Sequence, residues 1–152
     1  MRYVLGSTVV AWLALAVAWP VPGAGQDVGQ VKVTRGAVVI EREGREEPAA
    51  VGARVRASDV VRTGRDGSVG IGFLDGSLLS TGPNSVLVID RFAFDSTTHR
   101  GAFDTTLRKG TLAVISGKIA KQSPDAMKVR TPAALLGARG TEFAVRASGP
   151  GD

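Results

Sequence analysis

The stretch Asp66–Ser77, DGSVGIGFLDGS, decides the fold class more than any other part of the chain. An Asp-Gly pair stands near each end, and Val69, Ile71 and Phe73 alternate with other residues between them. Alternation with a period of two is typical of a strand with one buried face, because successive side chains point to opposite sides. Asp and Gly tolerate the positive φ that tight hairpin turns require. The stretch therefore predicts a strand between two tight turns.

Short apolar runs separated by turn residues continue on both sides of this stretch. Turn signals recur at roughly 8–12-residue spacing, and no long segment with helical periodicity follows residue 25, as in small all-β domains. The sequence predicts an all-β fold, either a compact sandwich or barrel or a solenoid-like sheet of short strands, and leaves these alternatives open. The other expected strands are Val31–Thr34, Ala37–Arg42, Val86–Phe92, Ala102–Leu107, Thr111–Ile119, Met127–Thr131 and Thr141–Arg146, with hairpin tips at Glu43–Arg45 and Asp95–Gly101.

The amino-terminal segment has the order of a secretory signal peptide. Met1–Arg2 form a short positive end, followed by a mostly apolar run to Trp19 and then by small residues. The alternative is an uncleaved anchor, but the run is short against the roughly 20 residues of a membrane-spanning helix, so we expect no membrane span in the mature chain. We expect a signal peptide over residues 1–25, cleaved near Gly23–Gly25, one β domain over residues 28–147, and a disordered tail over residues 148–152.

Composition limits the cellular compartments and the classes of partner that we expect for the protein. The 152 residues include no Cys, which excludes a thiol-linked lipid anchor and any disulfide. The formal net charge of +5 is spread along the chain without a basic stripe. Nucleic-acid-binding proteins concentrate Lys and Arg on one face, so we expect no nucleic-acid partner. Together with the signal peptide, these features predict a periplasmic or secreted protein.

Candidate catalytic groups are few. His99 is the only histidine and lies in a polar segment, and the chain has no Gly-x-Ser-x-Gly motif. A Ser-His-Asp triad would need His99 with Ser96 or Ser116, and one His without Cys is too few for a zinc site. We therefore expect no enzyme activity, no catalytic residues, no metal and no cofactor. An envelope hydrolase is the least favoured function.

The carboxyl-terminal run Arg130–Val145, RTPAALLGARGTEFAV, closes an ordered set of short motifs. The earlier motifs are Val61–Gly64 (VRTG), Phe73–Ser77 (FLDGS), Pro83–Ser85 (PNS) and Lys109–Leu112 (KGTL). In this order, the set resembles the FecR domain family over about Val31 to Val145. Each motif is weak alone, and their order makes the resemblance specific.

The resemblance implies an all-β module outside the cytoplasm that binds rather than catalyses. Known members include iron-siderophore signalling regulators with a cytoplasmic segment, a membrane span and a periplasmic domain that senses an outer-membrane receptor. Only Met1–Arg2 precede the apolar run here, so we expect a FecR domain exported alone. It would serve as a binding or scaffold module for an envelope protein or polysaccharide. The alternative is a component of FecR-like envelope signalling that senses a receptor and acts through another protein.

Arg139 is the first candidate binding residue. It stands between two glycines, where a guanidinium can approach a partner and make a bidentate contact to a carboxylate. The alternative is an internal ion pair with Glu142, Asp75 or Asp59 that holds the last strand. The internal pair is favoured, because structural ion pairs are the commoner outcome.

Further candidates for binding come from the same motifs: Thr141, Arg62, Asp75 and Asn84. Acidic turns such as Asp75–Gly76 supply oxygen atoms, but a calcium site needs about six of them, so ordinary turn chemistry is the favoured interpretation. A sheet edge offers another route, in which an extended peptide adds a strand. The strands beside the Asp95–Gly101 tip are the candidates for this mode.

If Arg139 makes an internal ion pair, Arg139→Ala should lower the free energy of unfolding by about 1–3 kcal/mol, because a buried acceptor loses its donor. Thermal melting of the wild type and the variant checks this. An unchanged melting curve would reject the internal pair and favour the contact with a partner.

Overall fold

Strands make up most of the protein in its computed structural model, which describes residues 25–138 and 141–149. The prediction of an all-β fold is confirmed. Within the described ranges the strands are β1 (Asp27–Arg35), β2 (Val38–Arg42), β3 (Arg45–Pro48), β4 (Arg54–Arg56), β5 (Val60–Thr63), β6 (Ser68–Phe73), β7 (Leu78–Thr81), β8 (Val86–Phe94), β9 (Gly101–Ile115), β10 (Met127–Arg130), β11 (Leu135–Gly137) and β12 (Glu142–Ala147). A short helix, α1 (Lys118–Gln122), and a 3₁₀ turn, η1 (Pro124–Ala126), lie between β9 and β10.

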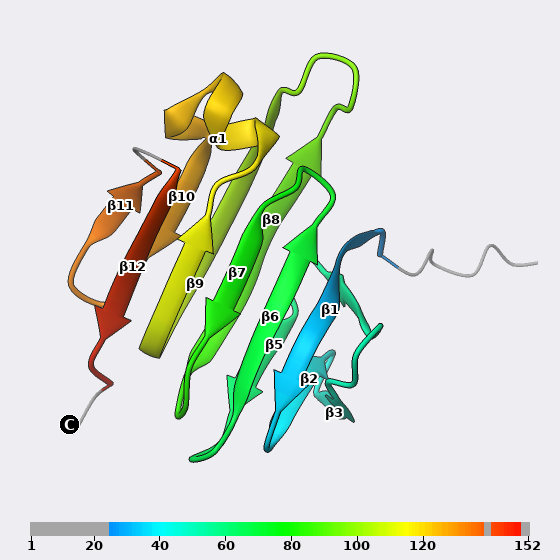
Figure 1. Cartoon of the computed structure of the whole chain (residues 1–152), viewed down its shortest axis with the longest axis vertical. Coiled ribbons are helices and arrows are strands. Elements are labelled where there is room, and N and C mark those ends of the chain that lie inside the picture. The colour runs from blue at the N-terminus through cyan, green and yellow to red at the C-terminus, as the bar shows by residue number, and fades with distance from the viewer. Residues whose placement is uncertain (1–24, 139–140, 150–152) are drawn as a thin grey trace, which may run out of the picture.

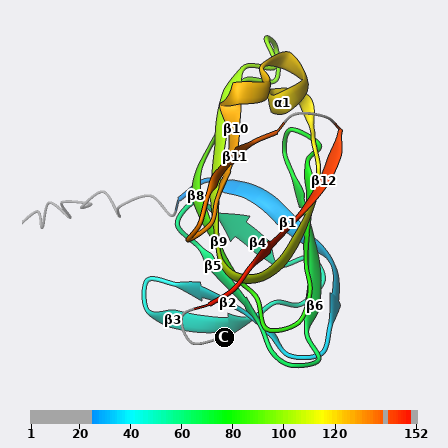
Figure 2. The same ribbon diagram turned by 90° about the vertical axis from the view of Figure 1, so that its left-hand side faces the viewer.

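The strands form two layers that belong to one curled sheet (Figures 1 and 2). The front sheet, which faces the viewer in Figure 1, has the order β4-β1-β6-β7-β9-β12. The back sheet has the order β3-β2-β5-β8-β9-β10-β11. The β9–β10 pair is parallel, and the other pairs named here are antiparallel. The result is a half-barrel folded over into a sandwich, within the range of architectures that the sequence predicts.

β9 is the strand that both sheets share. Its first half pairs with β8 and β10, and its second half pairs with β7 and β12. The buried side chains change from odd-numbered to even-numbered positions between the halves, as Leu107 and Leu112 show. Gly110 stands at this change with a φ of 96°, and a side chain there would collide with Ser85. The strand therefore keeps its apolar side facing inward while it passes from one layer to the other.

Side chains from both layers meet between the sheets. Phe73 of β6 packs against Phe103 of β9 with ring centroids 4.6 Å apart, and Phe92 of β8 lies 5.7 and 4.9 Å from these two rings. Burial of an aliphatic side chain contributes about 1.5–3 kcal/mol, so this inner layer supplies most of the stability. The fully buried aliphatic side chains include Val31, Val55, Val61, Ile71, Leu79, Leu87, Ile89, Leu107, Leu112, Ile119 and Met127.

Hydrogen bonds between buried polar groups connect the strands at the end of the molecule where the chain passes from one sheet to the other. Thr63 Oγ1 donates to the Gly82 carbonyl at 2.6 Å and accepts the Ser85 N–H at 2.8 Å. Ser85 Oγ in turn accepts the Thr111 N–H at 3.1 Å. Thr63 and Ser85 are both buried, so water cannot replace these bonds. The network joins β5, β8 and β9 beside Gly110.

The predicted strand Thr111–Ile119 is wrong in its last residues. β9 ends at Ile115, and α1 begins at Lys118. The Asp75 carbonyl accepts the Lys118 N–H at 2.8 Å, and Asp75 Oδ2 accepts the Ile119 N–H at 3.4 Å. These bonds cap the start of the helix, and the bond to Ile119 comes from 44 residues earlier in the chain. Local apolar patterning contains no sign of such a contact.

The described part of the chain contains no helix that is long and apolar enough to span a membrane. The predicted signal peptide falls on residues 1–24 and Gly25, of which only Gly25 lies within the described ranges. Residues 150–152 of the predicted tail also lie outside these ranges.

Gly110→Ala should lower the free energy of unfolding by about 3 kcal/mol or more, because overpacking adds to backbone strain. The new Cβ would meet the Cα and Cβ atoms of Ser85 at 2.5 and 2.6 Å. Gly76→Ala is the matched control: its φ is 83°, but no atom lies within 4 Å of the new Cβ, so strain alone should cost about 1–2 kcal/mol. Urea denaturation measures both. Equal losses would contradict the role assigned to the β9 bend.

Candidate binding surface

The predicted candidate residues do not converge on one site. Thr141 is exposed just before β12, where its carbonyl accepts the Ser116 N–H at 2.8 Å. It therefore lies at the same end of the sandwich as Asp75, which contacts the start of α1. Arg139 lies outside the described residues.

Arg62 and Asn84 lie away from that end. Arg62 projects from the outer side of β5, where its Nε and Nη2 contact Glu41 Oε2 at 2.9 and 2.8 Å. Asn84 stands in the turn between β7 and β8 with a φ of 52°, and its N–H donates to the Gly64 carbonyl at 3.0 Å. Both residues are engaged within the fold through these contacts.

The Asp75 carboxylate is fully buried and is used inside the fold. Oδ1 accepts the Ser77 N–H at 3.0 Å, and Oδ2 accepts the Ser77 hydroxyl at 2.8 Å. Ser77 Oγ also accepts the Gly117 N–H at 3.0 Å. With the bond to Ile119, these contacts fasten the β6–β7 hairpin to the start of α1. The described ranges hold no group of three or more potential metal-ligating side chains.

Exposed apolar and small residues gather on the outer side of the front sheet. Val33, Leu78 and Ile115 are 52%, 42% and 44% exposed there, which is unusual for aliphatic side chains so close together. The strand register places small residues between them, with Gly70 opposite both Val33 and Ser80. We define the front face as Val33, Gly70, Gly72, Leu78, Ser80, Ala113, Ile115 and Ala144.

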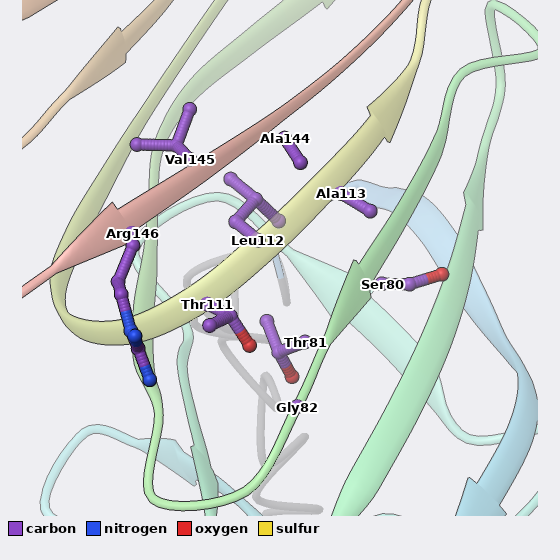
Figure 3. Close-up of a pocket in the computed structure, with 9 residues that line it drawn as sticks. All are labelled: Ser80, Thr81, Gly82, Thr111, Leu112, Ala113, Ala144, Val145 and Arg146. Atoms are coloured by element: carbon purple, nitrogen blue, oxygen red, sulfur yellow. The ribbon is translucent and has the colours of Figure 1, made fainter.

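A shallow groove of about 470 Å³ crosses the front face over β7, β9 and β12 (Figure 3). Ser80, Ala113 and Ala144 lie directly opposite one another on these three strands, so short side chains form the floor. Figure 3 shows Arg146 extending from β12 at one end, and Thr111 is its partner on β9. The groove is therefore largely apolar and has a cation at one end.

Arg146 is exposed and makes no ion pair with any residue in the described ranges. Arg42 shows the opposite case. Its Nε and Nη2 contact the two oxygens of the buried Asp59 at 2.8 and 2.7 Å, and these hydrogen bonds raise the pKa of Arg42. A guanidinium that lacks an internal carboxylate can accommodate one from a partner.

His99 belongs to the turn between β8 and β9. Its φ is 58°, and its ring stacks on Phe94 at a centroid distance of 6.2 Å. In this turn Asp95 Oδ1 accepts the N–H groups of Thr97 and Thr98 at 2.8 and 3.1 Å, and these bonds lower the pKa of Asp95. Across residues 25–138 and 141–149, no hydrogen bond joins the His99 side chain to a serine hydroxyl or a carboxylate.

The front face and its groove were not predicted from the sequence. Ser80, Ala113 and Ala144 become neighbours only when β7 and β12 pair with opposite edges of β9. Alternation along β12 indicates that Glu142, Ala144 and Arg146 share one side, but it does not identify their neighbours. Strand addition beside the Asp95–Gly101 tip stays a prediction: next to the tip β8 pairs with β9 on one side, and the pairing of β5 on its other side reaches only Val86–Val88.

A protein-family model described as FecR protein matches residues 59–151 of this chain. The match begins at the buried Asp59 and includes β5 to β12, hence the shared strand β9 and the groove. None of the curated proteins and none of the solved structures matches the chain.

Asp75→Ala should lower the free energy of unfolding by about 2–4 kcal/mol, because it leaves buried N–H and O–H donors without an acceptor. Asp66→Ala is the matched control from the other Asp-Gly turn. Asp66 is exposed and accepts one bond from the Ala37 N–H at 3.3 Å, so the loss there should stay below about 1 kcal/mol. Denaturant titration of both variants distinguishes them, and similar losses would show that Asp75 does not anchor α1.

Proposed function

The chain belongs to the FecR protein family, a family of envelope signalling proteins, and on that premise we propose that it is a non-enzymatic binding module in the periplasm or secreted space. The module recognises another envelope protein, and the front face is the surface it uses. The strand-addition mode is not needed for this contact, because side chains of the sheet face supply it.

This proposal rests on the exposure of the apolar front face. Removing apolar surface from water lowers the free energy by about 25 cal/mol per Å² of accessible area, so a partner that covers this face stabilises it. Val33, Leu78 and Ile115 are all large and about half exposed, and small residues leave the surface between them flat. Such patches on soluble domains mark interaction sites.

The chemistry of the front face favours a protein over a polysaccharide. Sugar rings carry many hydroxyl groups, which need hydrogen-bonding partners when they are buried. Among the side chains that define the front face only Ser80 offers a hydroxyl and none is aromatic, and the exposed Thr111 adds one more hydroxyl at the end of the groove. An aliphatic partner side chain fits such a surface without leaving polar groups unpaired.

Arg146 adds a positive charge at one end of the apolar contact. It stands at the end of the groove without an internal carboxylate, so an Asp or Glu of the partner would meet a guanidinium beside the apolar floor. A charged pair at the rim of an apolar contact adds specificity and association rate more than affinity. The partner is therefore a protein with aliphatic side chains next to a carboxylate.

Family membership favours envelope signalling as the setting in which this binding is used. In that role the partner is a receptor of the envelope, and the module passes the signal through another protein. The same front face serves the scaffold role and the signalling role, so the two differ in the identity of the partner.

A photoreactive amino acid at Ala113 should crosslink the protein in the envelope of its host to a discrete partner, because Ala113 lies on the floor of the groove. Ala93, which is exposed on β8 of the back sheet, is the matched control and should give no such product. Peptides from another protein in the mass spectrum of the crosslinked product identify a protein partner. A mass increase that glycosidase treatment removes identifies a glycan. Equal products from both positions, or a glycan alone, would contradict the proposal.

Arg146→Glu should weaken that crosslink about tenfold or more if a partner carboxylate meets Arg146, because an attractive pair becomes repulsive. Arg91→Glu is the control, since Arg91 is exposed on the back sheet beside Asp104. Crosslinking yields that fall equally in both variants would point to a general charge effect and remove Arg146 from the site.

A further inference from the structure

β12 is the outermost strand of the front sheet in the described part of the chain, where it pairs with β9 alone. An unpaired edge of six residues exposes backbone N–H and C=O groups that can pair with another strand. The other outer strands are less suited to this. β4 and β11 have three residues each, and β3 carries adjacent like charges and ends at Pro48.

The register with β9 shows which residues of β12 face the open edge. The Thr141 carbonyl accepts the Ser116 N–H, so the backbone of Thr141 points towards β9. Backbone groups alternate along an antiparallel strand, so Glu142, Ala144 and Arg146 direct their N–H and C=O groups to the open side. Their side chains lie on the outer surface, and the half-buried Phe143 and Val145 face inward.

We propose that β12 pairs antiparallel with β12 of a second copy of this chain, with Ala144 opposite Ala144 of that copy on a twofold axis. In this register Glu142 of each copy stands opposite Arg146 of the other on the outer surface. On the inner surface Phe143 stands opposite Val145. Opposite charges and aromatic–β-branched pairs are both favourable across strands, and the same patch on both copies makes the contact self-complementary.

Charge selects this register over the alternatives. Pairing requires Glu142, Ala144 and Arg146 to meet residues of the same set, because only these face the edge. A shift towards either end of β12 places Glu142 opposite Glu142 or Arg146 opposite Arg146, or places one of the two charges opposite Ala144 and leaves the other without a partner in β12. Like charges directly opposite are destabilising. Neither Glu142 nor Arg146 has an ion-pair partner within residues 25–138 and 141–149, so both are available.

The pairing goes beyond the proposed binding function and does not rest on it. Two front sheets joined at β12 would form one continuous sheet with the front faces on the same side. Ala144 at the axis has a side chain small enough to let the two strands approach. A monomer that still crosslinks through Ala113 would overturn the pairing and leave the binding function intact.

Charge reversal tests the register. The protein is purified from cells that express the full chain, and its mass is measured by sedimentation equilibrium. The wild type should dimerise. Glu142→Arg and Arg146→Glu should each weaken the dimer about tenfold or more, because each change makes two like-charge contacts. The double variant Glu142→Arg/Arg146→Glu restores both opposite pairs and should dimerise like the wild type. A monomeric wild type, or a double variant as weak as the single ones, would overturn the proposal.

A cysteine at the axis gives an independent test, since the chain has no Cys of its own. Directly opposite hydrogen-bonded residues have Cα atoms about 5.5 Å apart, within the range that a disulfide spans. Ala144→Cys should therefore form a dimer-linking disulfide with oxidised glutathione much faster than Ala113→Cys, the control on neighbouring β9. Equal rates would overturn the pairing, and so would a disulfide-free Ala144→Cys protein at concentrations where the wild type sediments as a dimer.

Discussion

One strand, β9, forms backbone hydrogen bonds in both sheets, and the rest of the structure depends on how it passes from one sheet to the other. Its first half completes the back sheet between β8 and β10, and its second half completes the front sheet between β7 and β12. A straight strand cannot do both. The bend at Gly110 moves the chain between layers, and Thr63 and Ser85 fasten the neighbouring turns to it through buried hydrogen bonds. The aromatic cluster of Phe73, Phe92 and Phe103 then packs between layers whose spacing β9 has set.

The same strand builds the surface assigned to function. Because β9 lies between β7 and β12 in the front sheet, it brings Ser80 and Ala144 to either side of Ala113 and creates the groove. It also leaves β12 at the edge, with alternating side chains of opposite charge. The sheet face and the sheet edge thus offer different contacts: an apolar surface for a partner protein, and a self-complementary strand for a second copy. Arg146 ends the groove and faces the edge, and its guanidinium has enough N–H donors for Glu142 of a second copy on one side and a carboxylate of the partner protein on the other.

Local sequence chemistry predicted the parts of this fold that depend on adjacent residues. The Asp75–Gly76 turn of the β6–β7 hairpin and the β2–β3 hairpin at Glu43–Gly44 agree with the structure, and Glu43, Gly44 and Gly76 have positive φ. The Asp66–Gly67 turn joins β5 to β6, which do not pair, and neither residue has positive φ. The FecR resemblance agrees with the family model. Contacts between distant residues were not predictable in this way. Asp75 caps α1 from 44 residues away, Asp59 pairs with Arg42, and the front face arises from strand order. Periodicity shows which side chains share a side, and tertiary pairing decides what that side contacts.

We expect that a partner covers the front face in the cell envelope. Thiol accessibility tests it directly, because the chain lacks Cys and a single one can be placed at Ser80 on the front face or at Ala93 on the back sheet. The two thiols should react equally with a small maleimide in the purified protein. In intact envelopes the thiol at position 80 should react much more slowly, and the thiol at position 93 should keep its rate. Equal rates at both positions in the envelope would show that the front face is uncovered and would contradict the account.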